Sequence, residues 1–381
     1  MAPVPRLGGS GPKMRRLIPL IALTLAMLLG AWLGGESWLA WQLRGLASGG
    51  GVLAVDDLHP RRDPLAPGVT LVTPRLTLGP TTLGFARADL VLAPLAPTRA
   101  RLDLPATARL ALPGGSHELG LGPPAIHARL LPLAGLLAAE ASIATGALTL
   151  DGQPLASGAE ARATLVRLGH DAPPEARTAY DITLALSDLD PAALPQAGRL
   201  AEAIPAPRRI SLTASGRLWL DRAPAPAALA AAPFPQPVGL RVDTARITIG
   251  PASARLLGRI EADDEGRARG AIAIYTTDAD RVIAAGAAAG LLPPGAAGLA
   301  QGMIRAISAM PMPGDDRPED PENAAAPHSA PAAGGAMRFP PAAPGELRLP
   351  LILEDGRVRL GPIPLGRAPF LRVQDPDAAP G

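Results

Sequence analysis

Residues 347–360 read LRLPLILEDGRVRL, and this stretch decides the fold class. From Leu347 to Leu353 every second residue is leucine, so a strand here would place the leucines together on one face. Asp355 and Gly356 follow. Asp-Gly between two such runs is a strong hairpin signal, because a type I′ turn needs a positive φ at both central positions. The stretch therefore predicts an antiparallel hairpin with one apolar face.

The same period of two recurs from Val69 onward. Leu148 to Leu150 is followed by Asp151-Gly152, a second predicted type I′ turn, and residues 263–266 (Asp-Asp-Glu-Gly) predict a longer hairpin loop. Further alternating runs lie at residues 99–104, 182–187, 210–220 and 256–261. Alternation of this kind is typical of half-buried antiparallel sheets rather than buried parallel ones. The predicted fold class is mainly β, with curved antiparallel sheet or sheets and a few short helices.

The alternation slips once. Leu240 and Val242 belong to one face, whereas Ala245 and Ile249 continue on the other. One extra residue in a strand shifts its phase in this way, so the slip predicts a β-bulge near Thr244.

Composition supports this fold class. The chain has 381 residues, of which 48% are hydrophobic, with 46 Pro and 42 Gly. Because an interior proline costs a helix about 3 kcal/mol, this content of helix breakers argues against a helical bundle. With 0 Cys, disulfides, thiolate metal sites and cysteine nucleophiles are excluded. The net charge is only +2, and the arginines are interleaved with Asp and Glu, so nucleic acid is not an expected partner.

Three short helices are expected. Asp190 would cap the first, with Pro191 at its first position and Pro205 ending it. Thr277 or Asp278 would cap the second, which runs through Ile283. The third carries apolar residues at helical spacing: Leu299, Met303, Ile304, Ile307 and Met310.

The first two helices share a context. Residues 182–190 and residues 272–280 each read as a strand, a Ser/Thr-Asp-x-Asp turn and a helix start. Their spacing of about 90 residues makes an internal duplication one interpretation, and chance recurrence of a short turn pattern is the other.

The N-terminus predicts a membrane anchor. Lys13, Arg15 and Arg16 precede a charge-free run from Leu17 to Leu33, which as a helix would span about 25 Å, close to the hydrocarbon thickness of a bilayer. The tryptophans at 32, 38 and 41 then lie where an interfacial belt belongs, and the preceding cations place the N-terminus in the cytoplasm. A cleavable signal peptide is the alternative, but the bulky residues after the run do not form a small-residue cleavage site.

The domain organisation follows. Residues 1–16 are expected to be a cytoplasmic tail and 17–41 the transmembrane anchor. Residues 42–68 are expected to be a flexible hinge and entry segment, since Ser48 to Gly51 is linker-like, and 69–310 the exported β-rich domain. The last two segments are a disordered Pro/Ala/acidic linker, 311–345, and a C-terminal hairpin that returns to the sheet with its tail, 346–381.

A search for chemistry finds no catalytic, cofactor-binding or metal-binding residues. The five histidines form no pair four residues apart, and a shared metal site for His117 and His127 is the weaker alternative to ordinary surface histidines. Ser215 and Ser253 lack a nucleophile-elbow sequence, and the acidic residues 263–265 read as a solvated hairpin tip. The chain is therefore not expected to be an enzyme. The histidines are His59, His117, His127, His170 and His328.

The C-terminal sequence from Leu351 to Gly366, LILEDGRVRLGPIPLG, and the segment Leu257 to Glu261 with its hairpin carry a family resemblance. Together with the anchor, they make the chain resemble the bacterial envelope family catalogued as domain of unknown function 2125, over residues 15–375. Because these motifs are structural, the resemblance brings no catalytic residues. More distantly, the layout is similar to the AsmA-like envelope proteins, which implies lipid handling or outer-membrane upkeep.

Two functions remain open. The first is a non-enzymatic protein of the bacterial inner membrane, single-pass with a periplasmic domain, that binds lipid acyl chains in an apolar β-sheet groove. The second is a scaffold that binds other envelope proteins through its sheet edges. The expected partners are thus the membrane, lipid and envelope proteins.

Overall fold

The structure is a computed structural model that describes most of the chain between residues 36 and 372. The predicted cytoplasmic tail and most of the predicted anchor and linker lie outside this part. Among the described residues, no helix is both long enough and apolar enough to cross a bilayer. The described residues are 36–37, 39–41, 43–44, 53–63, 65–94, 96–131, 134–195, 209–225, 234–288, 295–312, 337 and 339–372.

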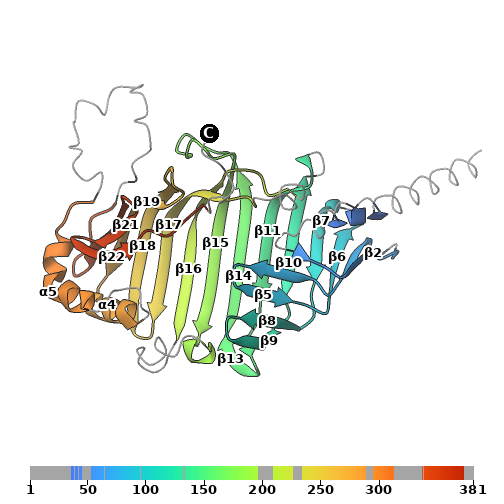
Figure 1. The fold of residues 1–381 in the computed structure, drawn as a ribbon, viewed down its shortest axis with the longest axis horizontal. Helices are drawn as coiled ribbons and strands as arrows, with labels where there is room; N and C mark the ends of the chain where they lie inside the picture. The colour runs from blue at the N-terminus through green and yellow to red at the C-terminus, as the bar shows by residue number, and fades with distance from the viewer. Residues whose placement is uncertain are drawn as a thin grey trace, which may run out of the picture.

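The described strands form two antiparallel sheets, which confirms the predicted fold class. The larger sheet has 15 strands, which stand side by side in Figure 1. In spatial order these are β2 (Asp57–Pro60), β3 (Gly68–Val72), β6 (Arg87–Ala93), β7 (Ala96–Asp103), β10 (Ala125–Leu131), β11 (Leu137–Thr145), β14 (Gly158–Val166), β15 (Thr178–Leu189), β16 (Ile210–Leu220), β17 (Pro237–Ile249), β18 (Ala252–Ala262), β19 (Ala268–Thr276), β20 (Leu347–Glu354), β21 (Arg357–Leu360) and β22 (Ile363–Arg367).

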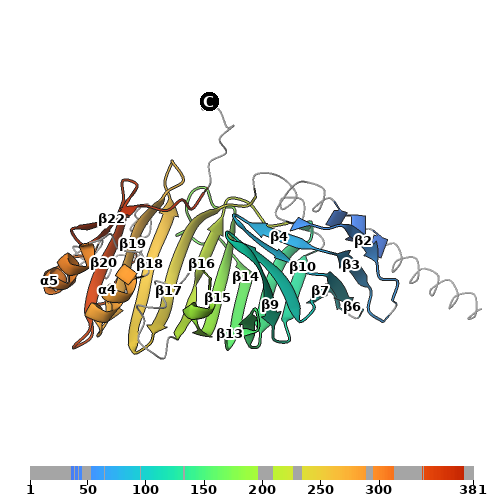
Figure 2. The same cartoon turned by 60° about the horizontal axis from the view of Figure 1, so that its bottom comes forward.

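The smaller sheet has 7 strands and lies over one side of the larger sheet, in front of β10 and β14 in Figures 1 and 2. Its strands, in spatial order, are β1 (Leu53–Ala54), β4 (Arg75–Leu78), β5 (Thr81–Gly84), β8 (Thr107–Leu112), β9 (Gly115–Leu121), β12 (Leu148–Leu150) and β13 (Gln153–Ala156).

The two sheets are one sheet folded along a crease. Each strand of the smaller sheet continues in sequence from or into a strand of the larger one, and the continuations follow the same spatial order. Backbone bonds join neighbouring strands at the crease: Thr73 N donates to Ala86 O at 3.0 Å, and Gly122 N to Ala147 O at 2.8 Å. Gly122 is required there, because a Cβ would lie 2.7 Å from Ala147 N. Glycine and proline weaken regular pairing, so the chain can change sheets at these positions.

The side of the larger sheet that turns toward the smaller one is apolar, and we call it the inner apolar face. One row of directly paired residues crosses 12 strands of the larger sheet without a polar side chain. The row, with each residue paired to the next, is Val69, Leu90, Leu102, Ile126, Ile143, Ala161, Leu184, Ala214, Ala245, Leu256, Ile274 and Leu349.

Each end of the inner apolar face is covered. At one end the described residues between 36 and 44 are helical, and Leu39 and Ala40 pack with Leu58, Val69 and strands β6 and β7. At the other end α4 (Ala279–Ala288) and α5 (Ala296–Ser308) bring Ile283 and Ile307 against Leu349 and Leu360 of the sheet.

The local turn and bulge predictions are confirmed. Asp151 and Gly152 have φ of 49° and 79°, and Asp355 and Gly356 have φ of 51° and 67°, as type I′ turns require. The register between β17 and β18 shifts between Val242 and Ala245, which confirms the bulge near Thr244.

The helix predictions are confirmed in part. The first helix is only a 3-10 turn, η2 (Pro191–Ala193), because Leu194 is already extended; Asp190 does cap it. The rest of that prediction lies outside the described residues. The second and third helices exist as α4 and α5, although Met310 follows the end of α5. Within α5, Leu299 and Met303 are 61% and 41% exposed, whereas Ile304 and Ile307 pack against the cluster that contains Leu349 of the sheet.

Two predicted boundaries differ from the structure. The anchor was expected to reach residue 41, yet Leu39 and Ala40 lie in the core of the β-domain, so the end of the expected anchor belongs to that domain. Strands β1 to β3 likewise occupy part of the expected hinge. Both ends of the expected linker 311–345 are packed, since Met312 and Phe339 are buried against Ala273 and Tyr275. In each case a few apolar side chains pack in the core, and the overall composition of the segment does not predict this.

The C-terminal hairpin returns to the sheet as predicted: β20 pairs with β19 and β21, and β22 adds one more strand. The two units of the suggested duplication both appear as a strand followed by a helical segment, β15 with η2 and β19 with α4. One ends in a single 3-10 turn and the other in a helix of 10 residues.

Candidate functional site

The centre of the inner apolar face is the candidate site. In β14 and β16, the inward positions are held by small residues, namely Ala161 and Ala163 in one strand and Ala214 and Gly216 in the other. A second apolar row lies beside the first. It consists of Leu92, Ala100, Ala128, Ala141, Ala163, Ile182, Gly216, Val242, Gly258, Ile272, Leu351, Leu360 and Ile363.

Side chains at this centre are exposed although they are apolar. Ile143 is 40% and Leu184 is 42% exposed, whereas Val69 and Leu349, in the same row but under the end covers, are 0% and 2% exposed. The covers at the two ends thus leave the central strands accessible. Exposing large aliphatic side chains to water costs about 25 cal/mol per Å², so a continuous patch of this kind marks an interaction surface.

The opposite face of the same strands is polar. Thr183, next to Leu184 in β15, pairs with Arg162 and Ser215, and Arg162 lies 3.8 Å from a Glu140 carboxylate oxygen. A hollow of about 590 Å³ lies against these strands. Most residues around it, His127 and Thr183 among them, point to this outer side by strand register, and the others belong to the inner apolar row: Ile143, Ala161, Leu184 and Ala214. Around Thr183 and Leu184 the two faces therefore differ in chemistry, and the inner one presents the apolar side chains.

The smaller sheet adds leucines to the inner side. Leu53, Leu76, Leu83 and Leu110 pair in sequence across β1, β4, β5 and β8. Leu53 packs against the same buried cluster as Leu90 of the larger sheet, which indicates that this row faces inward. Apolar residues of both sheets thus point into the fold.

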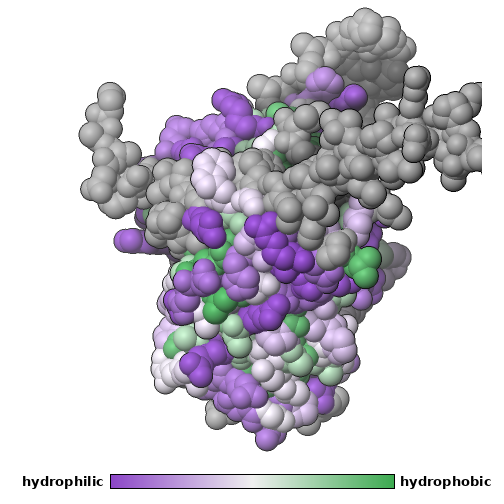
Figure 3. All heavy atoms as spheres, turned by 90° about the vertical axis from the view of Figure 1, so that its right-hand side faces the viewer, coloured by the Kyte–Doolittle hydropathy of each residue, from purple (hydrophilic) through white to green (hydrophobic). Residues whose placement is uncertain are grey.

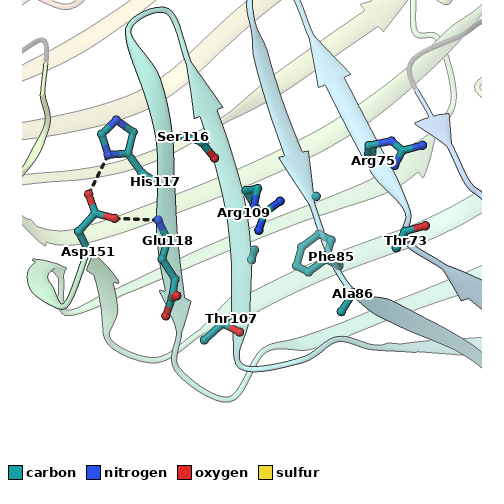
Figure 4. A pocket seen from close by; sticks show the side chains of 12 residues that line it. Thr73, Arg75, Phe85, Ala86, Thr107, Arg109, Ser116, His117, Glu118 and Asp151 are labelled. Carbon is teal, nitrogen blue, oxygen red and sulfur yellow. Dashed lines mark hydrogen bonds and ion pairs between the residues drawn. The ribbon is translucent and has the colours of Figure 1, made fainter.

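A second hollow, of about 840 Å³, lies on the outer side of the smaller sheet (Figure 4). Its lining includes charged side chains, with Arg75 on β4, Arg109 on β8 and Glu118 on β9, and Gly84 of β5 lies between the two arginines. In Figure 4 the His117 ring and the Asp151 carboxylate point toward one another, with 2.7 Å between Nδ1 and Oδ2.

The His117–Asp151 pair links two elements of the smaller sheet. The hydrogen bond from His117, and next the one from the Glu118 backbone N–H, hold the pKa of Asp151 below its ordinary value. A nucleophile would have to lie beside the ring. The neighbouring hydroxyl, Ser116, is the adjacent residue of β9, so its side chain points to the other face of the sheet. The pair instead ties the β12–β13 turn to β9.

The two histidines considered for a shared metal site lie in different sheets, His117 in β9 and His127 in β10. In the described part of the chain, no group of three or more His, Asp or Glu side chains is placed to hold a metal ion. The acidic residues 263–265 form the β18–β19 hairpin tip as predicted, where Asp263 accepts from the backbone N–H groups of Glu265 and Arg267.

The sequence predicts the apolar face but not the crease at which the sheet folds over it. The signal lay in short Gly/Pro interruptions at which one apolar run ends and the next begins, of which Gly122-Pro123-Pro124 is the clearest. These interruptions read as ordinary turns between hairpins, whereas the structure places them at the crease.

Comparison with known proteins gives one result. No curated protein and no solved structure matches the chain significantly. One protein family matches residues 36–369, and its description reads "Uncharacterized protein conserved in bacteria (DUF2125)". The match starts at Glu36, the first described residue of the β-domain, and covers nearly all of that domain. The chain therefore belongs to the DUF2125 family of bacterial proteins.

Proposed function

We propose that this chain is a non-enzymatic, membrane-anchored protein of the bacterial envelope that binds lipid acyl chains on its inner apolar face. The supporting observation is the exposed centre of that face, where Ile143 and Leu184 flank Ala161 in one uninterrupted apolar row. Small residues at Ala161 and Ala214 leave room above the sheet. An extended hydrocarbon chain matches such a surface, because it needs area without hydrogen-bond partners.

The anchor belongs to the same proposal. The charge-free run from Leu17 to Leu33, with cations before it, supports an inner-membrane helix with the β-domain in the periplasm. Binding of acyl chains next to a membrane would give such a protein a direct source of ligand.

Scaffolding through sheet edges is the second candidate, and the edges give it less support. The edge strands β2, β13 and β22 contain Pro60, Pro154 and Pro364, and β1 has only 2 residues. A proline cannot donate a ladder hydrogen bond, and short edges resist strand addition.

The test is native mass spectrometry of the full chain, followed by organic extraction, for Leu184→Asp and its matched control Thr183→Asp. The two variants place the same charge on adjacent residues of β15 but on opposite faces, and both side chains are exposed. We expect Leu184→Asp to lose bound phospholipid or fatty acid that the Thr183→Asp protein retains. Lipid around the anchor is common to both variants and cancels in the comparison.

Equal lipid content in the two variants, with both folded by circular dichroism, would refute acyl binding at this face. In that case, cross-linking to envelope proteins would become the informative experiment.

A further inference from the structure

The end of the domain next to the predicted anchor carries two exposed apolar side chains, Trp41 and Leu65, which are 65% and 85% exposed. This is the end of β2 and β6, on the right in Figure 1; Figure 3 views the molecule from that side, where apolar residues appear at the surface among polar ones. Neither residue takes part in the inner apolar face.

The segment that carries Trp41 is fixed to the domain. Leu39 and Ala40 on one side of this helical segment are buried, while Ser37 and Trp41, four residues apart, are exposed on the other. The segment is therefore amphipathic, with one side in the protein core and the other in water.

Glu36 joins this segment to the loop that carries Leu65. Its side chain is 2% exposed, and its carboxylate oxygens accept from Gly68 N at 2.8 Å and from Arg62 N at 3.2 Å. Arg62 also donates to Ser37 Oγ at 3.4 Å. A buried carboxylate that accepts from two backbone N–H groups fixes the helical segment and the loop relative to each other. Trp41 and Leu65 are thus held on one rigid unit of the domain.

We propose that residues 36–44 and 61–68 form a membrane-contact surface, whose partner is the lipid surface from which the chain emerges. This inference rests on the anchored arrangement proposed above, because the charge-free run ends at Leu33, only three residues before Glu36. A domain fixed that close to a bilayer meets the headgroups with this end. An exposed Trp beside exposed arginines at positions 44 and 62 is the composition that an interface favours.

The membrane-contact surface would fix the orientation of the inner apolar face relative to the bilayer. Leu39 and Ala40 cover the first strands of that face, on the back of the same segment that presents Trp41 to lipid. The domain does not swing on a hinge at residues 36–44; it rests on the bilayer by this end.

The absence of native cysteine provides a clean test. Leu65→Cys and, as a control at an exposed leucine on the opposite end of the molecule, Leu299→Cys would each carry one environment-sensitive fluorophore. The full-length chain is reconstituted in vesicles of phosphatidylethanolamine and phosphatidylglycerol, some with nitroxide lipids as quenchers. We expect a blue shift and quenching at residue 65 and neither at residue 299.

Adding Glu36→Ala to the Leu65→Cys chain should reduce the quenching, because the loop loses its fixed position. Emission at residue 65 that matches residue 299, or a chain that does not stay with the vesicles, would overturn the membrane-contact surface. Its failure is distinguishable from failure of acyl binding, since the Leu184→Asp comparison reports lipid on a different face.

Discussion

Ile143 and Leu184 lie on either side of Ala161 in one row of paired residues, and each leaves about two fifths of its side chain exposed on the apolar side of the sheet. Val69 and Leu349, near the two ends of the same row, are 0% and 2% exposed. This contrast between covered ends and an open centre sets the expected response of each position to substitution.

Leu349→Ala should destabilise the domain by about 2–5 kcal/mol, because Leu349 is 2% exposed and packs in the core under α4 and α5. Leu184→Ala, at the same row but 42% exposed, should cost about 1 kcal/mol or less. Urea denaturation of both variants measures the difference. Equal losses would mean that the centre of the face is covered in solution.

Ala161→Phe should lower the lipid content without unfolding the protein. The new ring would stand between Ile143 and Leu184 and occupy area that an acyl chain needs, while the open centre leaves it room. Lipid extraction and thermal melting of the same sample test both halves of this statement. Arg162→Phe, the next residue on the outer face, is the control and should keep its lipid.

Glu36→Ala should cost about 1–3 kcal/mol, because it leaves the buried N–H of Gly68 and the partly buried N–H of Arg62 without their acceptor. Glu36→Gln keeps an amide oxygen that can accept and should cost less. Hydrogen exchange at Gly68 should accelerate most in the alanine variant; unchanged protection there would show that the carboxylate does not hold the loop.

Asp151 should contribute pH-dependent stability. Its pKa is held below the ordinary 3.8 first by His117 and then by the Glu118 N–H. A lowered folded pKa means that the contribution is present above the unfolded pKa and is lost as the pH falls through the folded value. Asp151→Asn keeps a residue that tolerates the positive φ of this turn and removes the charge. Urea midpoints of the two proteins should differ near neutral pH and converge in acid; a gap that persists in acid would contradict the assignment.

The local features could be read from the sequence. The type I′ turns at Asp151 and Asp355, the bulge near Thr244 and the cap at Asp190 follow from φ preferences and side-chain hydrogen bonds within a few residues. The same holds for the apolar face of β20. Each of these features depends on residues only a few positions apart, so a local sequence pattern is enough to predict it.

The candidate site could be read only in part. The sequence showed an apolar β-face and no catalytic motif. The alternating pattern predicted that Leu184 and Leu349 both face inward and did not distinguish between them. The structure separates them, since one is 42% and the other 2% exposed. Their difference comes from α4 and α5, which return over one end of the sheet from a distant part of the chain.

The strand content, the antiparallel pairing, the turns and the apolar alternation follow from local sequence, because each is set by a period of two and by the backbone angles of a few residues. The fold of the sheet at Gly122, the place of Leu39 in the core and the exposure of Leu299 could not be predicted in this way. These outcomes depend on which apolar surfaces meet, and contacts between segments far apart in sequence leave no local pattern.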